Sequence, residues 1–273
     1  MAAPSDFLSR WQQVGALRLH ALVFADPTYP PAVLLPGLVT ASRSMVPLAR
    51  ALRQYRLRPW ILDLPGFGYS DKPTRALGLN EQADIVADWL HAVGLAPARL
   101  LGNSFGSQLA ATVAAAHPDA VARLVLVAPT VGPAVRRRMA WLRTLPGPTG
   151  SANRTTGRAR ASLLGRLHDL LGDRPPLRVL NLAEYGCASL ARAVSSVRCA
   201  VFEQLDQALP QVSAPTLLLR ADHDRLSSLE WAQRLAELPG DARLVQLPDL
   251  GHAAFYGAAD TVAGIAGPFL ADG

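Results

Sequence analysis

Short apolar runs alternate with helical stretches along most of this chain, and this alternation restricts the fold more than any other feature of the sequence. The apolar runs are short, as strands buried on both faces of a sheet are. They lie at 32–37, 58–68 (a strand that ends in a Pro/Gly turn), 98–103, 121–129, 214–222 and 242–249. Stretches with helical spacing lie at 45–55, 81–94, 105–117, 228–238 and, after the run at 242–249, to about 270. Asn80 can cap the helix over 81–94. Strands that alternate with helices predict an α/β fold with a mostly parallel sheet and helices on both faces. The alternating segment 15–24 predicts an antiparallel strand at its start.

The alternation stops between residues 131 and 210, and this segment is predicted to be a helical insertion. The sheet domain then consists of 1–130 and 211–273. Within the insertion, 146–162 is rich in Gly, Pro, Ser and Thr and predicts a loop. An insertion that follows a sheet strand lies at the carboxyl ends of the strands, where open α/β sheets bind ligands. We therefore expect residues 131–210 to form a lid.

The positive charge of the chain is concentrated in this insertion. The formal net charge is +6, and residues 131–210 contain 12 Arg against 5 Asp or Glu. Two interpretations remain open. The arginines form a solvated face, or they attract an acidic partner such as a carboxylate-bearing substrate, a coenzyme A ester or an acyl carrier protein. No pattern of basic residues interleaved with aromatic ones indicates binding to nucleic acid.

Other features of the composition bear on the cellular setting. No apolar run approaches the ~20 residues that span a bilayer, and residues 1–15 lack the apolar core of a secretion signal. Cys187 and Cys199 do not form a disulfide framework, so both are expected to be reduced thiols. These observations predict a cytoplasmic protein without a membrane span. They do not indicate an oligomeric state.

The sequence Gly102-Asn103-Ser104-Phe105-Gly106 fits the pattern G-x-S-x-G and joins an apolar strand to an Ala-rich helix. In that setting the two glycines permit a tight turn, and the Ser104 hydroxyl is exposed above the sheet at the helix N-terminus. A plain N-cap serine between incidental glycines is the alternative. The motif by itself does not decide between them.

A nucleophilic serine needs a base, and the base needs an acid that orients it. Asp222 and Asp224 follow the strand at 214–222, and His252 follows the last strand. The order Ser, acid, His along the chain is the one typical of a strand-to-helix nucleophile turn. We expect Ser104 and His252 to act together, with either aspartate as the acid.

Two backbone N–H groups are needed to stabilise an oxyanion. Phe105 directly follows the nucleophile and supplies one. Leu38 is expected to supply the other, because Pro36-Gly37 ends the strand at 32–37 in a close turn.

Together these motifs resemble the α/β-hydrolase fold family, in its branch of lid-bearing serine hydrolases. They are Leu35-Pro36-Gly37-Leu38, the run LDLPGFGYSDKP at 62–73, the Ser104 turn, Asp224 and Gly251-His252. The family usually has its acid as the last residue of a G-x-x-D turn. That resemblance favours Asp224 over Asp222, with Ala221 in place of the glycine.

The resemblance also separates branches of the family. Haloalkane dehalogenases and epoxide hydrolases of this fold use an aspartate as the nucleophile. This chain has Ser104 at that position, which argues against both classes. The sequence GNSFG resembles hydrolases that split carbon–carbon bonds in ring-cleavage products. Those enzymes usually carry a tryptophan after the catalytic histidine, where this chain has Ala253.

We therefore expect a serine hydrolase that cleaves a carboxylic ester, lactone or thioester of a small-molecule acyl substrate through an acyl-enzyme. Neither a metal nor a cofactor is expected to take part. Hydrolysis of a vinylogous diketone is the alternative reaction. A non-catalytic small-molecule receptor with the same fold is the alternative of a different class.

Overall fold

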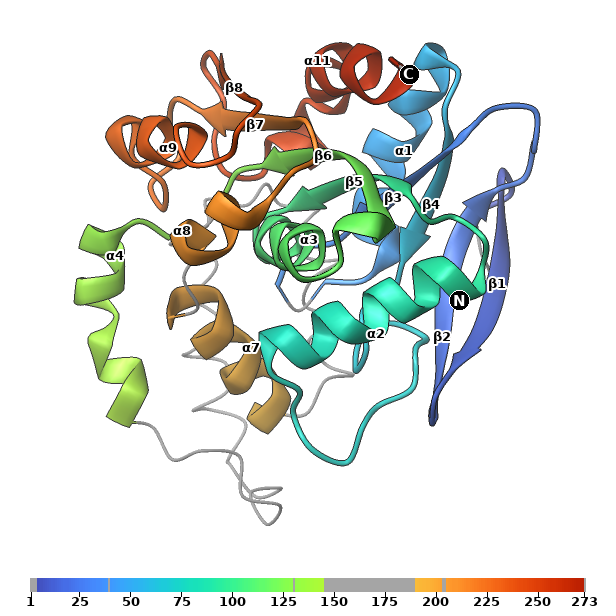
Figure 1. Cartoon of the computed structure of the whole chain (residues 1–273), viewed down its shortest axis with the longest axis horizontal. Coiled ribbons are helices and arrows are strands. Elements are labelled where there is room, and N and C mark those ends of the chain that lie inside the picture. Colours follow the sequence, from blue (N-terminus) through green and yellow to red (C-terminus); the bar gives the residue numbers. More distant parts are fainter. Residues whose placement is uncertain (1–3, 39, 130, 145–189, 203–204, 273) are drawn as a thin grey trace.

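The computed structural model describes residues 4–38, 40–129, 131–144, 190–202 and 205–272 (Figure 1). One sheet of eight strands runs through it, in the order β1-β2-β4-β3-β5-β6-β7-β8. The strands are β1 (Phe7–Val14), β2 (Leu17–Phe24), β3 (Pro31–Leu35), β4 (Arg58–Leu62), β5 (Ala98–Asn103), β6 (Val121–Val127), β7 (Thr216–Ala221) and β8 (Ala242–Leu247). The pairs β1–β2 and β2–β4 are antiparallel, and all the other pairs are parallel. The predicted α/β fold with a mostly parallel sheet is confirmed.

Helices cover both faces of the sheet. They are α1 (Val46–Leu52), α2 (Leu79–Ala92), α3 (Phe105–Ala116), α4 (Pro133–Arg138), α7 (Leu190–Phe202), α8 (Leu205–Ala208), α9 (Leu229–Ala236), α10 (Ala254–Gly257) and α11 (Ala259–Ala271). Helices α1 and α11 pack together on one face, and α2, α3 and α9 cover the other (Figure 1).

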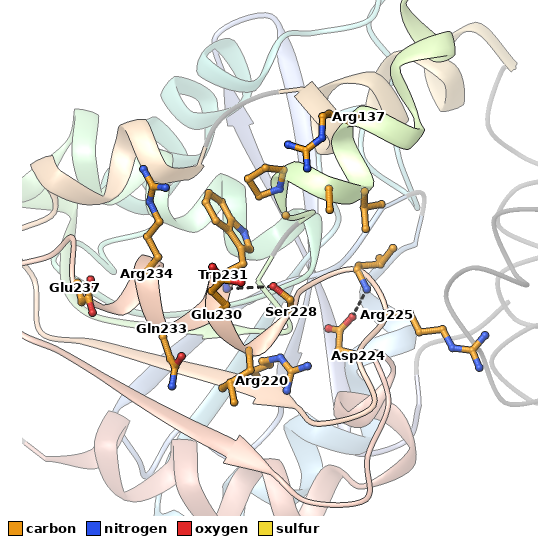
Figure 2. Close-up of a pocket in the computed structure, with 16 residues that line it drawn as sticks. Arg137, Arg220, Asp224, Arg225, Ser228, Glu230, Trp231, Gln233, Arg234 and Glu237 are labelled. Carbon is orange, nitrogen blue, oxygen red and sulfur yellow. Dashed lines mark hydrogen bonds between the residues drawn. The ribbon is translucent and has the colours of Figure 1, made fainter.

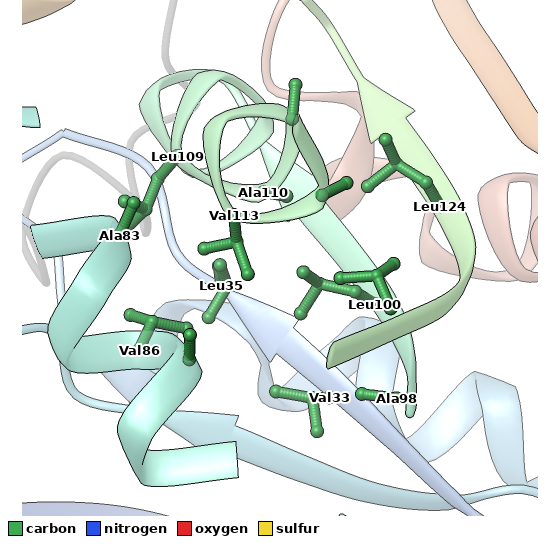
Figure 3. Packing of buried hydrophobic residues seen from close by; sticks show 14 of the residues in the cluster. Val33, Leu35, Ala83, Val86, Ala98, Leu100, Leu109, Ala110, Val113 and Leu124 are labelled. Atoms are coloured by element: carbon green, nitrogen blue, oxygen red, sulfur yellow. The ribbon is translucent and has the colours of Figure 1, made fainter. Parts of the chain in front are cut away.

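Alternate residues of each strand point to opposite faces, so the core has two apolar layers. In β3, Val33 and Leu35 belong to the layer under α2 and α3, whereas Leu34 belongs to the layer under α1 and α11. Figure 3 shows Val33 and Leu35 together with Val113 of α3 and Val86 of α2. Because both faces are covered, the central strands are mostly apolar, which is why their positions could be predicted.

Strand β1 was not among the predicted elements. It forms the outer edge of the sheet, and of its eight residues only Phe7 and Val14 at its two ends are buried. An edge strand with most side chains in solvent carries no regular apolar pattern. Its pairing with β2 over the full length of both strands defines it instead.

Helix α2 begins earlier than expected. Asn80 was predicted to cap a helix over 81–94, but the helix runs from Leu79 and its N-cap is Gly78. The Glu81 carboxylate accepts a hydrogen bond from the Gly78 N–H at 2.9 Å. This side chain satisfies a backbone donor ahead of the first turn, so Asn80 is not needed as a cap.

The described parts of the predicted insertion, 131–144, 190–202 and 205–210, are largely helical. They contain α4, α7, α8 and short 3₁₀ turns at Ala140–Thr144 and Leu209–Gln211. Four buried side chains, Val131, Leu142, Val197 and Val201, form a small apolar cluster of their own. The predicted loop at 146–162 and Cys187 lie outside the described residues. Within the described ranges, no helix is both long enough and apolar enough to cross a bilayer.

Candidate active site

Ser104 lies in a sharp turn between β5 and α3. Its backbone angles are φ 53° and ψ −115°, a conformation that costs a non-glycine residue about 1–3 kcal/mol. A Cβ atom on Gly102 would lie 2.1 Å from the Gly106 carbonyl oxygen, so position 102 accepts only glycine. The Ser104 N–H donates to the Val127 carbonyl of β6 at 2.9 Å, which fixes the turn to the neighbouring strand.

His252 follows β8 and lies beside Ser104, although 148 residues separate them in the chain. The distance from His252 Nε2 to Ser104 Oγ is 2.9 Å, and that from His252 Nδ1 to Asp224 Oδ2 is also 2.9 Å. His252 and Asp224 are buried and Ser104 is half-buried. The three side chains form one continuous hydrogen-bonded chain. The buried Asp224 carboxylate lies at one end and the half-buried Ser104 hydroxyl at the other.

The Asp224 carboxylate is stabilised in its ionised form. Burial alone would raise its pKa. The positive charge of protonated His252 and the hydrogen bond to its ring act in the opposite sense, as do hydrogen bonds from two backbone N–H groups. Those groups are Leu226 N–H at 2.8 Å and Ser227 N–H at 3.3 Å, both to Asp224 Oδ1. The net effect holds the pKa of Asp224 below its ordinary value, so the carboxylate can stabilise an imidazolium at His252.

The other candidate acid, Asp222, is exposed and engaged elsewhere. Its carboxylate oxygens accept hydrogen bonds from the N–H groups of Asp249 and Leu250, at 2.9 and 3.2 Å. Asp222, His223 and Asp249 form the one group in the described part of the chain that could hold a metal ion, and all three are exposed. Asp222 thus supports the turn before His252, while Asp224 faces the ring.

The predicted oxyanion donors belong to two segments that adjoin Ser104. Phe105 opens α3, and an N–H in the first turn of a helix has no carbonyl partner within that helix. On the other side, a Cβ atom on Gly37 would lie 3.5 Å from Ser104 Cβ, so the turn that carries Leu38 touches the nucleophile. The side chain of Leu38 is half-buried against the apolar cluster of the insertion.

A cleft of ≈ 850 Å³ lies behind the Asp224 loop, between α4 and α9 (Figure 2). Asp224 and Arg220 line it, whereas Ser104 and His252 do not. Arg220 is only 6% exposed, and sequence reasoning did not single it out. In the sequence it is one arginine at the end of an apolar strand. Only the fold shows that its guanidinium reaches the loop that holds the acid.

Residues 30–259 match the sequence model of a family described as alpha/beta hydrolase fold. A pimeloyl-[acyl-carrier protein] methyl ester esterase of Stenotrophomonas maltophilia is 30% identical over 251 residues, which cover 89% of this chain and 93% of the esterase. A haloalkane dehalogenase of Mycobacterium marinum is 40% identical over 115 residues, or 40% of this chain. The match spans only 38% of that dehalogenase. Among solved structures, a membrane phospholipase A described as a bacterial virulence factor has a TM-score of 0.79 and 26% identity, over 97% of this chain and 86% of that one.

Proposed function

This chain belongs to the alpha/beta hydrolase fold family, and we propose that it is a serine hydrolase of carboxylic esters, lactones or thioesters. The observation that carries the proposal is the hydrogen-bonded chain from Ser104 through His252 to Asp224, with 2.9 Å at each link. That arrangement supplies a nucleophile, a base and an orienting acid in sequence.

In the proposed reaction Ser104 Oγ attacks the acyl carbon while His252 Nε2 takes the hydroxyl proton. Asp224 holds His252 with its Nδ1 proton toward the carboxylate and stabilises the imidazolium that forms. The N–H groups of Phe105 and Leu38 donate to the oxyanion of the tetrahedral intermediate. The imidazolium then protonates the leaving alcohol or thiol, and an acyl-enzyme remains. Water, deprotonated by His252, releases the acid and restores Ser104.

We further propose that residues 131–210 act as a lid over this site. The apolar cluster formed by Val131, Leu142, Val197 and Val201 supports this role, because Leu38 packs against it. The side chain next to one oxyanion donor would then be held in place by the insertion. Closing such a segment would exclude water and strengthen hydrogen bonds to the oxyanion.

The charge of the insertion bears on the substrate. Arg137 and Arg138 in α4 are exposed, and a cluster of exposed cations raises the encounter rate with anions. The relative from Stenotrophomonas maltophilia is named for a methyl ester on an acyl carrier protein. An acidic or carrier-bound acyl group is therefore the substrate class that we propose to examine first.

The proposal is tested with a fluorophosphonate probe and a substrate panel. The probe should label Ser104, as mapped by peptide mass, and the Ser104→Ala variant should not be labelled. The panel contains p-nitrophenyl esters, a lactone, an acyl thioester and a ring-fission diketone. We expect turnover of at least one of the first three. Turnover of the diketone alone would favour carbon–carbon hydrolysis, and no labelling or turnover at all would favour a receptor.

A further inference from the structure

Arg220 lies in β7, four residues before Asp224, in a strand whose residues are all buried. Its side chain is 6% exposed. A guanidinium cannot lose its charge, so burying it costs free energy unless its donors are satisfied. Its partners therefore indicate why an arginine occupies this position.

The Arg220 guanidinium donates to two backbone carbonyls of the loop that carries the acid. Nε donates to the Ser227 carbonyl at 2.8 Å, and Nη2 donates to the Asp222 carbonyl at 3.3 Å. These two residues lie on either side of Asp224 in the chain. Across the described residues, no carboxylate lies within ion-pair distance of Arg220. The guanidinium thus closes the loop 222–227 rather than neutralising a nearby acid.

The same loop is closed a second time by Asp224 itself. Asp224 Oδ1 accepts the N–H groups of Leu226 and Ser227, which leaves Asp224 Oδ2 for His252 Nδ1. Ser227 takes part in both closures, because its N–H points to the carboxylate and its carbonyl to the guanidinium. A shift of Ser227 would therefore change the direction of the Asp224 carboxylate.

We propose that Arg220 is a positioning residue, which holds the loop 222–227 so that Asp224 faces His252. This inference rests on the proposed function. Arg220 acts through Asp224, so its loss should lower kcat and leave KM nearly unchanged. A misplacement of about 1 Å in a catalytic group can cost 10²-fold in rate, and we expect a loss of about 30- to 100-fold for Arg220→Ala.

The cleft behind the loop permits a chemical-rescue test. If Arg220 had only a structural role, added guanidinium would not restore activity. Arg220 lines this cleft (Figure 2), so a small cation from solvent can reach the space that Arg220→Ala leaves empty. Guanidinium chloride at 50 mM should restore part of the activity of Arg220→Ala, at least fivefold. The same concentration of sodium chloride should not. Arg220→Lys, which retains one donor group, should lose only about tenfold.

Arg234→Ala is the matched control, because Arg234 is an exposed arginine of α9 that lines the same cleft. It should show wild-type kinetics and no response to guanidinium. The rate of fluorophosphonate labelling serves as a readout that needs no known substrate. The downfield proton resonance of His252 Nδ1–H serves as one that needs no turnover.

The outcomes separate this inference from the proposed function. A folded Arg220→Ala that labels within threefold of wild type and keeps the downfield resonance unshifted would overturn the role of Arg220. A loss that guanidinium does not restore, with that resonance unshifted, would also overturn it. If Arg220→Ala does not fold, the labelling rate and the downfield resonance of Arg220→Lys decide instead. If wild type is neither labelled nor active, the proposed function fails, and the resonance still reports whether Arg220 orients the pair.

Discussion

Gly106 of α3 and the carbonyl oxygen of Leu35 at the end of β3 lie so close that a Cβ atom on Gly106 would be 2.2 Å from that oxygen. It would also lie 2.6 Å from the Pro36 carbonyl oxygen. The first turn of α3 therefore rests directly on the turn that leads to Leu38. This contact sets the distance between the two proposed oxyanion donors, because each belongs to one of the touching segments.

Gly106→Ala should destabilise the protein by about 3 kcal/mol, at the upper end of the usual cost of overpacking, because backbone atoms cannot move aside as a side chain can. It should also slow fluorophosphonate labelling by at least tenfold. Urea unfolding and labelling rates measure the two effects. Gly240→Ala is the control, since nothing lies within 4 Å of a Cβ atom at Gly240. Equal behaviour of the two variants would contradict the close packing at Gly106.

Asp224→Asn should lower kcat by about 10⁴-fold, because an amide favours the wrong tautomer of His252. Asp222→Asn should change kcat by less than about threefold, because Asp222 receives its hydrogen bonds from backbone N–H groups on the exposed side of the turn. Steady-state kinetics on one substrate compares the variants. The reverse ranking would assign the acid to Asp222.

The lowered pKa of Asp224 leads to a prediction for the pH profile. A carboxyl whose pKa lies below its ordinary value of 3.8 is mostly ionised at every pH above 3.8. Above about pH 4, therefore, a single protonation, that of His252, should account for the loss of activity on the acid side. We expect log(kcat/KM) to fall with a slope of one there. A slope of two between about pH 4 and pH 6 would mean that Asp224 titrates in the same range.

The three consecutive arginines of α4 should differ in their effects. The Arg136 side chain is 16% exposed and its guanidinium lies 3.9 Å from Asp206 and 5.8 Å from the centre of the Trp231 ring. Arg136→Ala should lower the free energy of unfolding by about 1 kcal/mol, through loss of these contacts. Arg137→Ala and Arg138→Ala should change stability by less than about 0.5 kcal/mol.

The dependence of activity on substrate charge tests whether the two exposed arginines, Arg137 and Arg138, attract the substrate. If Arg137 and Arg138 attract the substrate, the double alanine variant should lower kcat/KM several-fold for an anionic ester at low salt and leave a neutral ester of equal acyl length unaffected. The difference should vanish at 1 M salt, where the Debye length is ~3 Å. Flat salt responses for both esters in wild type would leave these arginines as a solvated face.

The sheet was predictable from the sequence because its central strands are apolar on both faces. Strand β1 was not, because its long-range pairing with β2 defines it and most of its side chains are exposed. The start of α2 was misplaced because the Glu81 side chain caps the helix from within, so that Asn80 is helical. For β1 the deciding interaction joins backbone groups alone, and for α2 it joins the Glu81 side chain to the backbone N–H of Gly78.

The candidate site was predictable in part. Ser104 and His252 are identified by their spacing and by the strands that precede them. The residues alone left Asp222 and Asp224 both open, and only the resemblance to the α/β-hydrolase fold family favoured Asp224. The structure has Asp224 facing the ring, at 2.9 Å from His252 Nδ1. Arg220 was missed, because its role depends on two carbonyl contacts that only the folded loop creates.

The most direct test of the central claim is the turnover of Ser104→Ala on the best substrate in the panel, with thermal unfolding as the check on its fold. Removal of the nucleophile from a serine triad costs on the order of 10⁶-fold in kcat. We expect a loss of that order with an unchanged melting temperature. A folded Ser104→Ala variant that keeps more than about a tenth of the wild-type rate would contradict the assignment of Ser104 as the nucleophile.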